Sequence, residues 1–307
     1  MITFLRRKGL GAGSVRGMAC WLTSTPTGGA TSVGVRRWLA PNGKASVLRN
    51  DTIGTGASLR ILEETQLLVR WGCTTETGIG IEKQVNPSRG IHSINDKLGA
   101  RQMLSQEAPE LIPKTIWRLS DSHDGEMILR PKHHAQGRNL HVVEDMGTLR
   151  RLATRYGEGN WYASELIDKV REVRVYWVNG RVATIAEKTP SDPSAVAWNV
   201  AQGGRFDVIG WGDWPLEACR VACEAMKHFE LDFGGVDLMM DRDGRWYLIE
   251  INSAPSLPLL SDGSVSYRQK CMAKTFKWML EHGKERMDAD YSNGWRGYIH
   301  PAIREYD

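Results

Sequence analysis

The strongest constraint on the fold lies between residues 234 and 255, where two short apolar segments flank the turn Asp241-Arg242-Asp243-Gly244. Both segments alternate apolar and polar residues, and an Asp-Gly step between such segments is the strongest short-range signal for a β-hairpin. The sequence therefore predicts antiparallel strands over residues 235–240 and 245–251.

One face of this predicted hairpin carries oxygen-bearing side chains. Glu250 and Asn252 are two positions apart, so they share a face, and Asp237 on the partner strand can join them across the ladder. Mg²⁺ binds through a few carboxylate or amide oxygens and completes its octahedron with water and substrate phosphates. The trio therefore predicts a magnesium site, with an exposed acidic hairpin as the alternative.

The same residues resemble the metal-binding end of the ATP-grasp ligases, in which an Asp, a Glu and an Asn at this spacing precede a stretch like Ser253-Ala254-Pro255. In that family, which includes D-alanine–D-alanine ligase and the ribosomal-protein glutamate ligase, these residues hold two Mg²⁺ ions that bridge the β- and γ-phosphates of ATP. The resemblance thus implies ATP and two Mg²⁺ ions as cofactors, with Mn²⁺ as an alternative metal. It also implies an α+β (ATP-grasp) fold, in which two α/β subdomains clasp ATP behind a small α/β N-terminal lobe.

Upstream of the hairpin, the resemblance assigns residues to the phosphates. Asn95 or Asp96 is expected to cap a helix that carries Lys97, and strands are expected over residues 115–119 and 126–130. Lys97 and Arg130 match the residues that grip the α- and β-phosphates, with Lys132 beside them, although the family usually has Lys where Arg130 stands. The segment 133–139, with Gly137, matches the mobile lid that covers the phosphates.

The segment 161–168 looks like a strand that leads into the linker between the two subdomains. By resemblance, Glu165 and Ile167 are the candidates for adenine contacts and Asp168 is the candidate for the ribose. Taken alone, the segment reads equally well as an ordinary amphipathic strand.

Residues 172–183 form an alternating pattern around an Asn-Gly step, which predicts a second hairpin. Arg174 matches the arginine that faces the transferred γ-phosphate in the family, where a fixed guanidinium neutralises developing charge. Lys188 at the end of the next strand, and Asn199 before a pair of glycines, are placed near the phosphates and the acceptor. These three are the candidate catalytic residues.

The implied reaction is attack of a substrate carboxylate on the γ-phosphate of ATP, followed by capture of the acyl-phosphate by an amine to form an amide. Two alternatives remain open from the sequence: an ATP-binding scaffold without turnover, and a kinase built on the same fold. The expected organisation is an N-terminal lobe over residues 1–91, subdomain A over 92–160, subdomain B over 161–285, and a tail over 286–307 that the resemblance does not explain.

Charge distribution bears on the partners. The first acidic residue is Asp51, while residues 1–50 hold eight lysines and arginines. Such a basic segment suits an acidic acceptor, such as an acidic protein tail, besides a small-molecule or peptide carboxylate and an amine; nucleic acid is not favoured as a partner. No apolar run approaches the roughly 20 residues of a membrane span, and no signal peptide is recognisable, so a cytoplasmic protein is expected.

Overall fold

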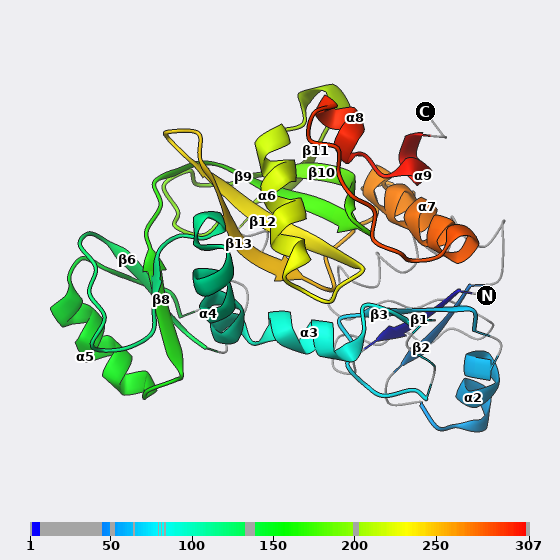
Figure 1. Ribbon diagram of the computed structural model, residues 1–307, viewed down its shortest axis with the longest axis horizontal. Coiled ribbons are helices and arrows are strands. Elements are labelled where there is room, and N and C mark those ends of the chain that lie inside the picture. The colour runs from blue at the N-terminus through cyan, green and yellow to red at the C-terminus, as the bar shows by residue number, and fades with distance from the viewer. Residues whose placement is uncertain are drawn as a thin grey trace.

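The computed structural model of the protein describes residues 2–6, 45–49, 53–63, 65–78, 80, 82, 84–132, 139–198 and 203–304. These residues form three β-sheets with helices packed beside them, and Figure 1 shows the three units arranged along the long axis of the molecule. Among the described residues, no helix is long and apolar enough to span a membrane.

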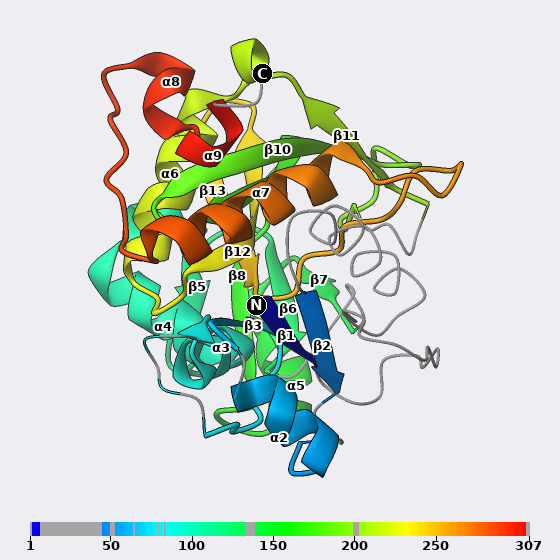
Figure 2. The same ribbon diagram turned by 90° about the vertical axis from the view of Figure 1, so that its right-hand side faces the viewer.

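The N-terminal unit is a parallel sheet of strand order β2-β1-β3-β4, accompanied by helix α2 (Gly56–Glu63). Its strands are β1 (Ile2–Arg6), β2 (Ala45–Arg49), β3 (Leu67–Trp71) and β4 (Gln84–Val85). At the end of β3, Trp71 stacks on Phe233, with ring centroids 5.0 Å apart. This unit therefore packs directly on the largest sheet, and Figure 2 shows the two side by side.

The second sheet is antiparallel, with the order β5-β8-β6-β7 and with α5 (Met146–Tyr156) against it. Its strands are β5 (Thr115–Ile116), β6 (Met127–Pro131), β7 (His141–Val143) and β8 (Trp161–Glu165). The strand expected over 115–119 ends at Ile116, because the Asp121 carboxylate accepts hydrogen bonds from the backbone N–H groups of Trp117 and Arg118. Since β8 pairs with β5 and β6, residues 161–165 belong to this sheet rather than to the subdomain expected to begin at residue 161.

The largest sheet is antiparallel and has the order β11-β10-β9-β12-β13. Its strands are β9 (Lys169–Val178), β10 (Arg181–Thr189), β11 (Arg205–Ile209), β12 (Phe233–Asp241) and β13 (Trp246–Asn252). Helix α6 (Leu216–Lys227) packs against β9 and β13, while α7 (Tyr267–His282) packs on the face that carries Phe233, which contacts Phe276 at 5.2 Å between ring centroids. Both predicted hairpins, 172–183 and 235–251, are confirmed in this sheet.

Two helices connect the N-terminal unit with the rest: α3 (Ser88–Asn95) and α4 (Lys97–Glu107). Asp96 caps α4 as predicted, since its side chain accepts from Gly99 N at 3.2 Å. The proposed division between residues 91 and 92 falls inside α3. The C-terminal tail forms α8 (Gly294–Tyr298) and α9 (Pro301–Arg304), and it joins β10 through a bridge between Val182 and Ile299.

Candidate active site

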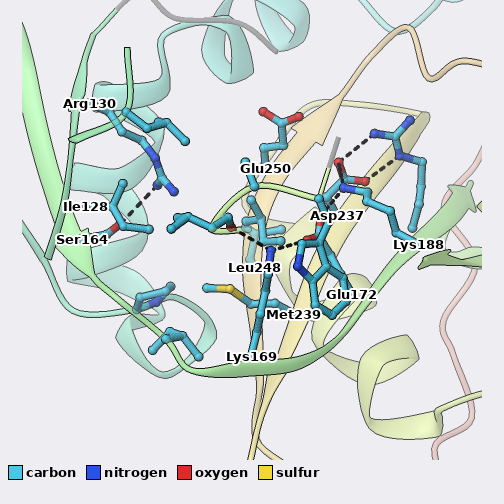
Figure 3. Close-up of a pocket in the computed structure, with 18 of the residues that line it drawn as sticks. Ile128, Arg130, Ser164, Lys169, Glu172, Lys188, Asp237, Met239, Leu248 and Glu250 are labelled. Atoms are coloured by element: carbon cyan, nitrogen blue, oxygen red, sulfur yellow. Dashed lines mark hydrogen bonds and ion pairs between the residues drawn. The ribbon is translucent and has the colours of Figure 1, made fainter. Parts of the chain in front are cut away.

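A cavity of about 1570 Å³ lies between the second sheet and the five-stranded sheet. Ten of the residues predicted from the sequence line it: Lys97, Arg130, Glu165, Ile167, Asp168, Arg174, Lys188, Asp237, Glu250 and Asn252. In Figure 3, Arg130 and Ser164 stand on one side of the cavity, Asp237, Glu172 and Lys188 on the other, and Glu250 between them. Predicted residues Gly137 and Asn199 lie outside the described part of the chain.

The proposed metal ligands come together on β12 and β13. Asp237 pairs directly with Glu250 in the ladder, and Asn252 pairs with Gly235. A bulge follows at once, because Leu238 pairs with Leu248 and leaves Ile249 as the extra residue. Asn252 Nδ2 donates to Glu250 Oε1 at 3.1 Å, which leaves its carbonyl oxygen for another ligand. Two carboxylates and an amide oxygen on one face form a donor set that suits a hard cation.

Asp237 forms a bidentate ion pair with Arg174 on the neighbouring strand β9. Arg174 Nε and Nη2 donate to the two carboxylate oxygens at 2.5 and 2.7 Å, and both residues are buried. Burial by itself would lower the pKa of Arg174, but the charge and hydrogen bonds of Asp237 outweigh it and raise the pKa above its usual value. Arg174 is therefore a permanent, fixed cation beside the metal ligands.

Glu250 is bound by a second cation, Lys97 of α4, at 2.5 Å. Burial opposes ionisation of Glu250, but the charge and hydrogen bond of Lys97, the hydrogen bond from Asn252 and the charge of Arg174 together lower its pKa to about 2. Glu250 is thus a carboxylate at any physiological pH. Residues 97 and 250 are 153 positions apart in the chain, so this contact ties α4 to the metal hairpin.

Glu172 is a site residue that sequence reasoning left out of the candidate set. Its side chain is 4% exposed and accepts from Lys169 Nζ at 2.7 Å and from Lys188 Nζ. Lys188 Nζ also lies 3.9 Å from Asp237 Oδ2. The spacing of Glu172 and Arg174 already placed them on one face, and the lysine partners are what give Glu172 its position in the network.

The opposite wall supplies further cations. Arg130 Nη1 donates to Ser164 Oγ at 3.2 Å, and its guanidinium lies 6.0 Å from the centre of the Tyr162 ring. Lys132 does not line the cavity and instead lies 3.3 Å from Asp96, the cap of α4. Arg101, one turn after Lys97, is buried and donates to the backbone carbonyl of Ile249 at 2.5 Å, so it holds the bulge next to Glu250. Burial lowers the pKa of Arg101 to about 10.

The predicted nucleotide linker follows β8 and borders the same cavity. Glu165 N donates to Lys114 O at 2.9 Å and Leu166 N donates to Glu126 O at 2.9 Å, which fixes the start of the linker. The proposed ribose contact Asp168 is largely exposed and pairs with Arg242 of the β12–β13 turn at 2.5 Å. The linker therefore runs from one wall of the cavity to the other.

Comparison with known proteins agrees with this geometry. Residues 82–270 match a family model described as an ATP-grasp domain, the third family of its clade. The chain belongs to the ATP-grasp family. The α+β (ATP-grasp) fold expected from the sequence is thereby confirmed. A search of curated protein sequences finds no significant match.

Solved structures of ATP-grasp ligases share the fold at low sequence identity. A RiPP-associated ATP-grasp ligase of Chryseobacterium gregarium, in complex with ADP and a leader and core peptide, has a TM-score of 0.61 and 13% identity, covering 94% of this chain and 100% of that one. The ligase PsnB with minimal precursor, Mg and ADP has a TM-score of 0.59 and 14% identity, covering 91% and 97%. D-alanine–D-alanine ligase of Bacillus anthracis with ATP has a TM-score of 0.52 and 12% identity, covering 99% and 97%.

Proposed function

We propose that this ATP-grasp protein is a Mg·ATP-dependent carboxylate–amine ligase that forms an amide through an acyl-phosphate. The observation that carries the proposal is the placement of Asp237, Glu250 and Asn252 on one hairpin face, beside Arg174 and in the same cavity as Arg130. A site that only held nucleotide would have little need of all three ligands and of a buried arginine fixed against one of them.

Each wall of the cavity has a separate task in this reaction. Asp237, Glu250 and Asn252 would hold the two Mg²⁺ ions, which neutralise phosphate charge when bound. Lys97 and Arg130 would bind the α- and β-phosphates, with Lys132 behind them. Guanidinium and ammonium groups suit phosphate oxygens, and Arg130 can bind them bidentately where the family usually has Lys.

The adenosine would occupy the linker side of the cavity. Glu165 and Ile167 border it there and remain our candidates for adenine contacts, as Asp168 does for the ribose. Asp168 would have to share its carboxylate between the ribose and Arg242. Gly137 in the lid and Asn199 near the acceptor remain predictions from the resemblance.

The chemistry then needs no covalent protein nucleophile. A carboxylate oxygen attacks the γ-phosphorus while the bond to the bridging oxygen of ADP breaks, and ADP leaves with that electron pair. The amine next attacks the acyl carbon, loses a proton and displaces inorganic phosphate. Arg174 and Lys188 would offset charge on the transferred group, an effect typically worth on the order of 10²–10³ in rate for one group.

A carboxylate borne by a peptide or a small molecule is the substrate class we propose, together with an amine acceptor. Solved relatives include ligases complexed with precursor peptides and one that joins D-alanine, so the fold accepts both sizes. The eight basic residues among the first fifty favour an acidic acceptor such as a Glu-rich protein tail.

The first test is thermal unfolding with ATP alone, Mg²⁺ alone and both. Nucleotide at 100 times its Kd should stabilise the wild type by roughly 2.7 kcal/mol. Glu250→Gln/Asn252→Ala should lose the Mg²⁺-dependent part of that shift, and Glu187→Gln, an acid on β10 outside the cavity, should keep it. Trapping with hydroxylamine then identifies the reaction, because an acyl-phosphate gives a hydroxamate and a kinase product does not. A wild type without a Mg·ATP shift would refute the proposal.

A further inference from the structure

Arg268, in the first turn of α7, is a cavity residue to which the proposed function gives no task. Its side chain is buried to 7% exposure and borders the cavity. Arg268 Nη1 donates to Tyr176 Oη at 3.1 Å, and that hydroxyl donates to the backbone carbonyl of Ser256 at 3.2 Å. Since Tyr176 is fully buried, the guanidinium is held in one place.

Three cations surround the ring of Phe206 on β11. The charged groups of Arg174, Lys188 and Arg268 lie 4.9, 5.6 and 5.5 Å from its centroid. A single phenyl ring therefore separates Arg268 from the two cations that stand beside the proposed metal ligands. A cation over an aromatic face is favourable, but it leaves the hydrogen-bonding edge of a guanidinium available.

Only two of these three cations have an acidic partner among the described residues. Arg174 pairs with Asp237 and Lys188 with Glu172, whereas Arg268 forms no ion pair with any described residue. Asp207 is near enough to feel the charge of Arg268, but its carboxylate accepts from Arg205 at 2.8 Å and from Thr189 at 2.9 Å. A buried charge without a counterion is unfavourable until an anion joins it.

On the basis of the proposed function, we propose that Arg268 binds the carboxylate of the acyl substrate, the group that receives the γ-phosphoryl. A planar two-oxygen carboxylate matches the fork of a guanidinium. The phosphates already have Lys97, Arg130 and Arg174, and Arg268 contacts none of the proposed metal ligands. It lies instead beside Phe206 and Ser256, one ring away from Arg174, where the attacking carboxylate must wait.

The test uses three probes on the protein saturated with Mg·ADP. N-acetyl-L-glutamate α-amide offers a side-chain carboxylate, N-acetyl-L-alanine offers a main-chain carboxylate, and N-acetyl-L-glutamine α-amide is neutral. One of the two carboxylates should raise the Tm of the wild type and support hydroxamate formation with ATP and hydroxylamine, while the neutral probe does neither. Which carboxylate responds tells whether the substrate presents a side chain or a chain end.

Arg268→Gln should weaken the response to that carboxylate by roughly 10- to 100-fold, the value of one charge-assisted contact. Arg268→Lys should recover part of it, and the Tm shift with Mg·ATP should be unchanged in both. The matched control is Arg205→Gln, a cavity arginine whose side chain is 72% exposed and paired with Asp207, and it should behave as the wild type.

Three results would overturn the assignment. The first is an Arg268→Gln variant with unaltered carboxylate dependence, and the second is one that loses the Mg·ATP shift as well, which would make Arg268 a nucleotide or structural residue. The third is a wild type that binds Mg·ATP but responds to neither carboxylate. Failure of the proposed function itself is distinguishable, because the wild type would then show no Mg·ATP shift.

Discussion

Removing the charge of Glu172 should destabilise the protein far more than removing the same charge at its surface neighbour Glu187. Glu172 is 4% exposed and accepts from Lys169 and Lys188, of which Lys188 is 6% exposed. Glu172→Gln keeps the shape but leaves two lysines without their counterion, and breaking a buried pair in this way costs about 3–5 kcal/mol. At about 2–4 °C per kcal/mol for a chain of this size, the Tm should fall by roughly 6–20 °C.

Glu187→Gln is the matched control, since it removes the same charge from the adjacent strand. Glu187 binds Arg171 through both oxygens at 2.7 and 2.9 Å, but both side chains are about one-third exposed. Such exposed pairs contribute about 0.2–1 kcal/mol, so its Tm should fall by no more than about 4 °C. Calorimetry or urea unfolding compares the two variants, and Glu172→Gln/Lys188→Met should recover part of the loss. Equal effects of the two single substitutions would refute the reasoning.

Three further outcomes are expected. Arg174→Lys replaces the two-nitrogen contact with Asp237 by a point charge and should lower hydroxamate formation about 10²–10³-fold, whereas an undiminished rate would remove Arg174 from the reaction. Gly235→Ala places a Cβ 2.7 Å from the Pro255 Cβ and should cost about 1–3 kcal/mol in urea unfolding, while Gly212→Ala, which meets nothing within 4 Å, should cost less than about 1 kcal/mol. Burial lowers the pKa of His300 to about 3, so the folded state stays neutral where the unfolded state gains a proton, and stability falls as the pH drops below about 6.5. His300→Asn should therefore lose roughly 1 kcal/mol less than the wild type between about pH 6.5 and 5.5, and parallel curves for the two proteins would contradict this.

The hairpins could be read from the sequence because their signal is local. Alternation and an Asn-Gly or Asp-Gly step fix both the strands and their partners within a few residues, and the ladder indeed opposes Asp237 and Glu250. The bulge at Ile249 could not be read in this way, since the residue that fixes it is Arg101, 148 positions earlier. The early end of β5 depended likewise on a side chain, Asp121, that competes for backbone donors.

The site could be predicted as a set of residues but not as a set of contacts. Family order identifies Arg174, Asp237 and Glu250, yet nothing local shows which cation binds which carboxylate across 63 or 153 positions. Arg268 carried no signal at all, because an arginine at the start of an amphipathic helix reads as a solvated charge. Only the packing of α7 over Tyr176 and Phe206 brings it to the cavity.

These contacts bear on how nucleotide would enter the site. The cations that would bind phosphate are engaged by the carboxylates that would bind metal: Arg174 occupies both oxygens of Asp237, and Lys97 binds Glu250. Mg²⁺ alone would have to displace these cations, and ATP alone would draw them away and leave buried carboxylates unpaired, which is costly. Mg²⁺ and ATP arriving together exchange both partners at once, so that each carboxylate and each cation keeps a counterion. The site is therefore built to favour the Mg·ATP complex over either component, and the Tm shift with both should exceed the sum of the separate shifts.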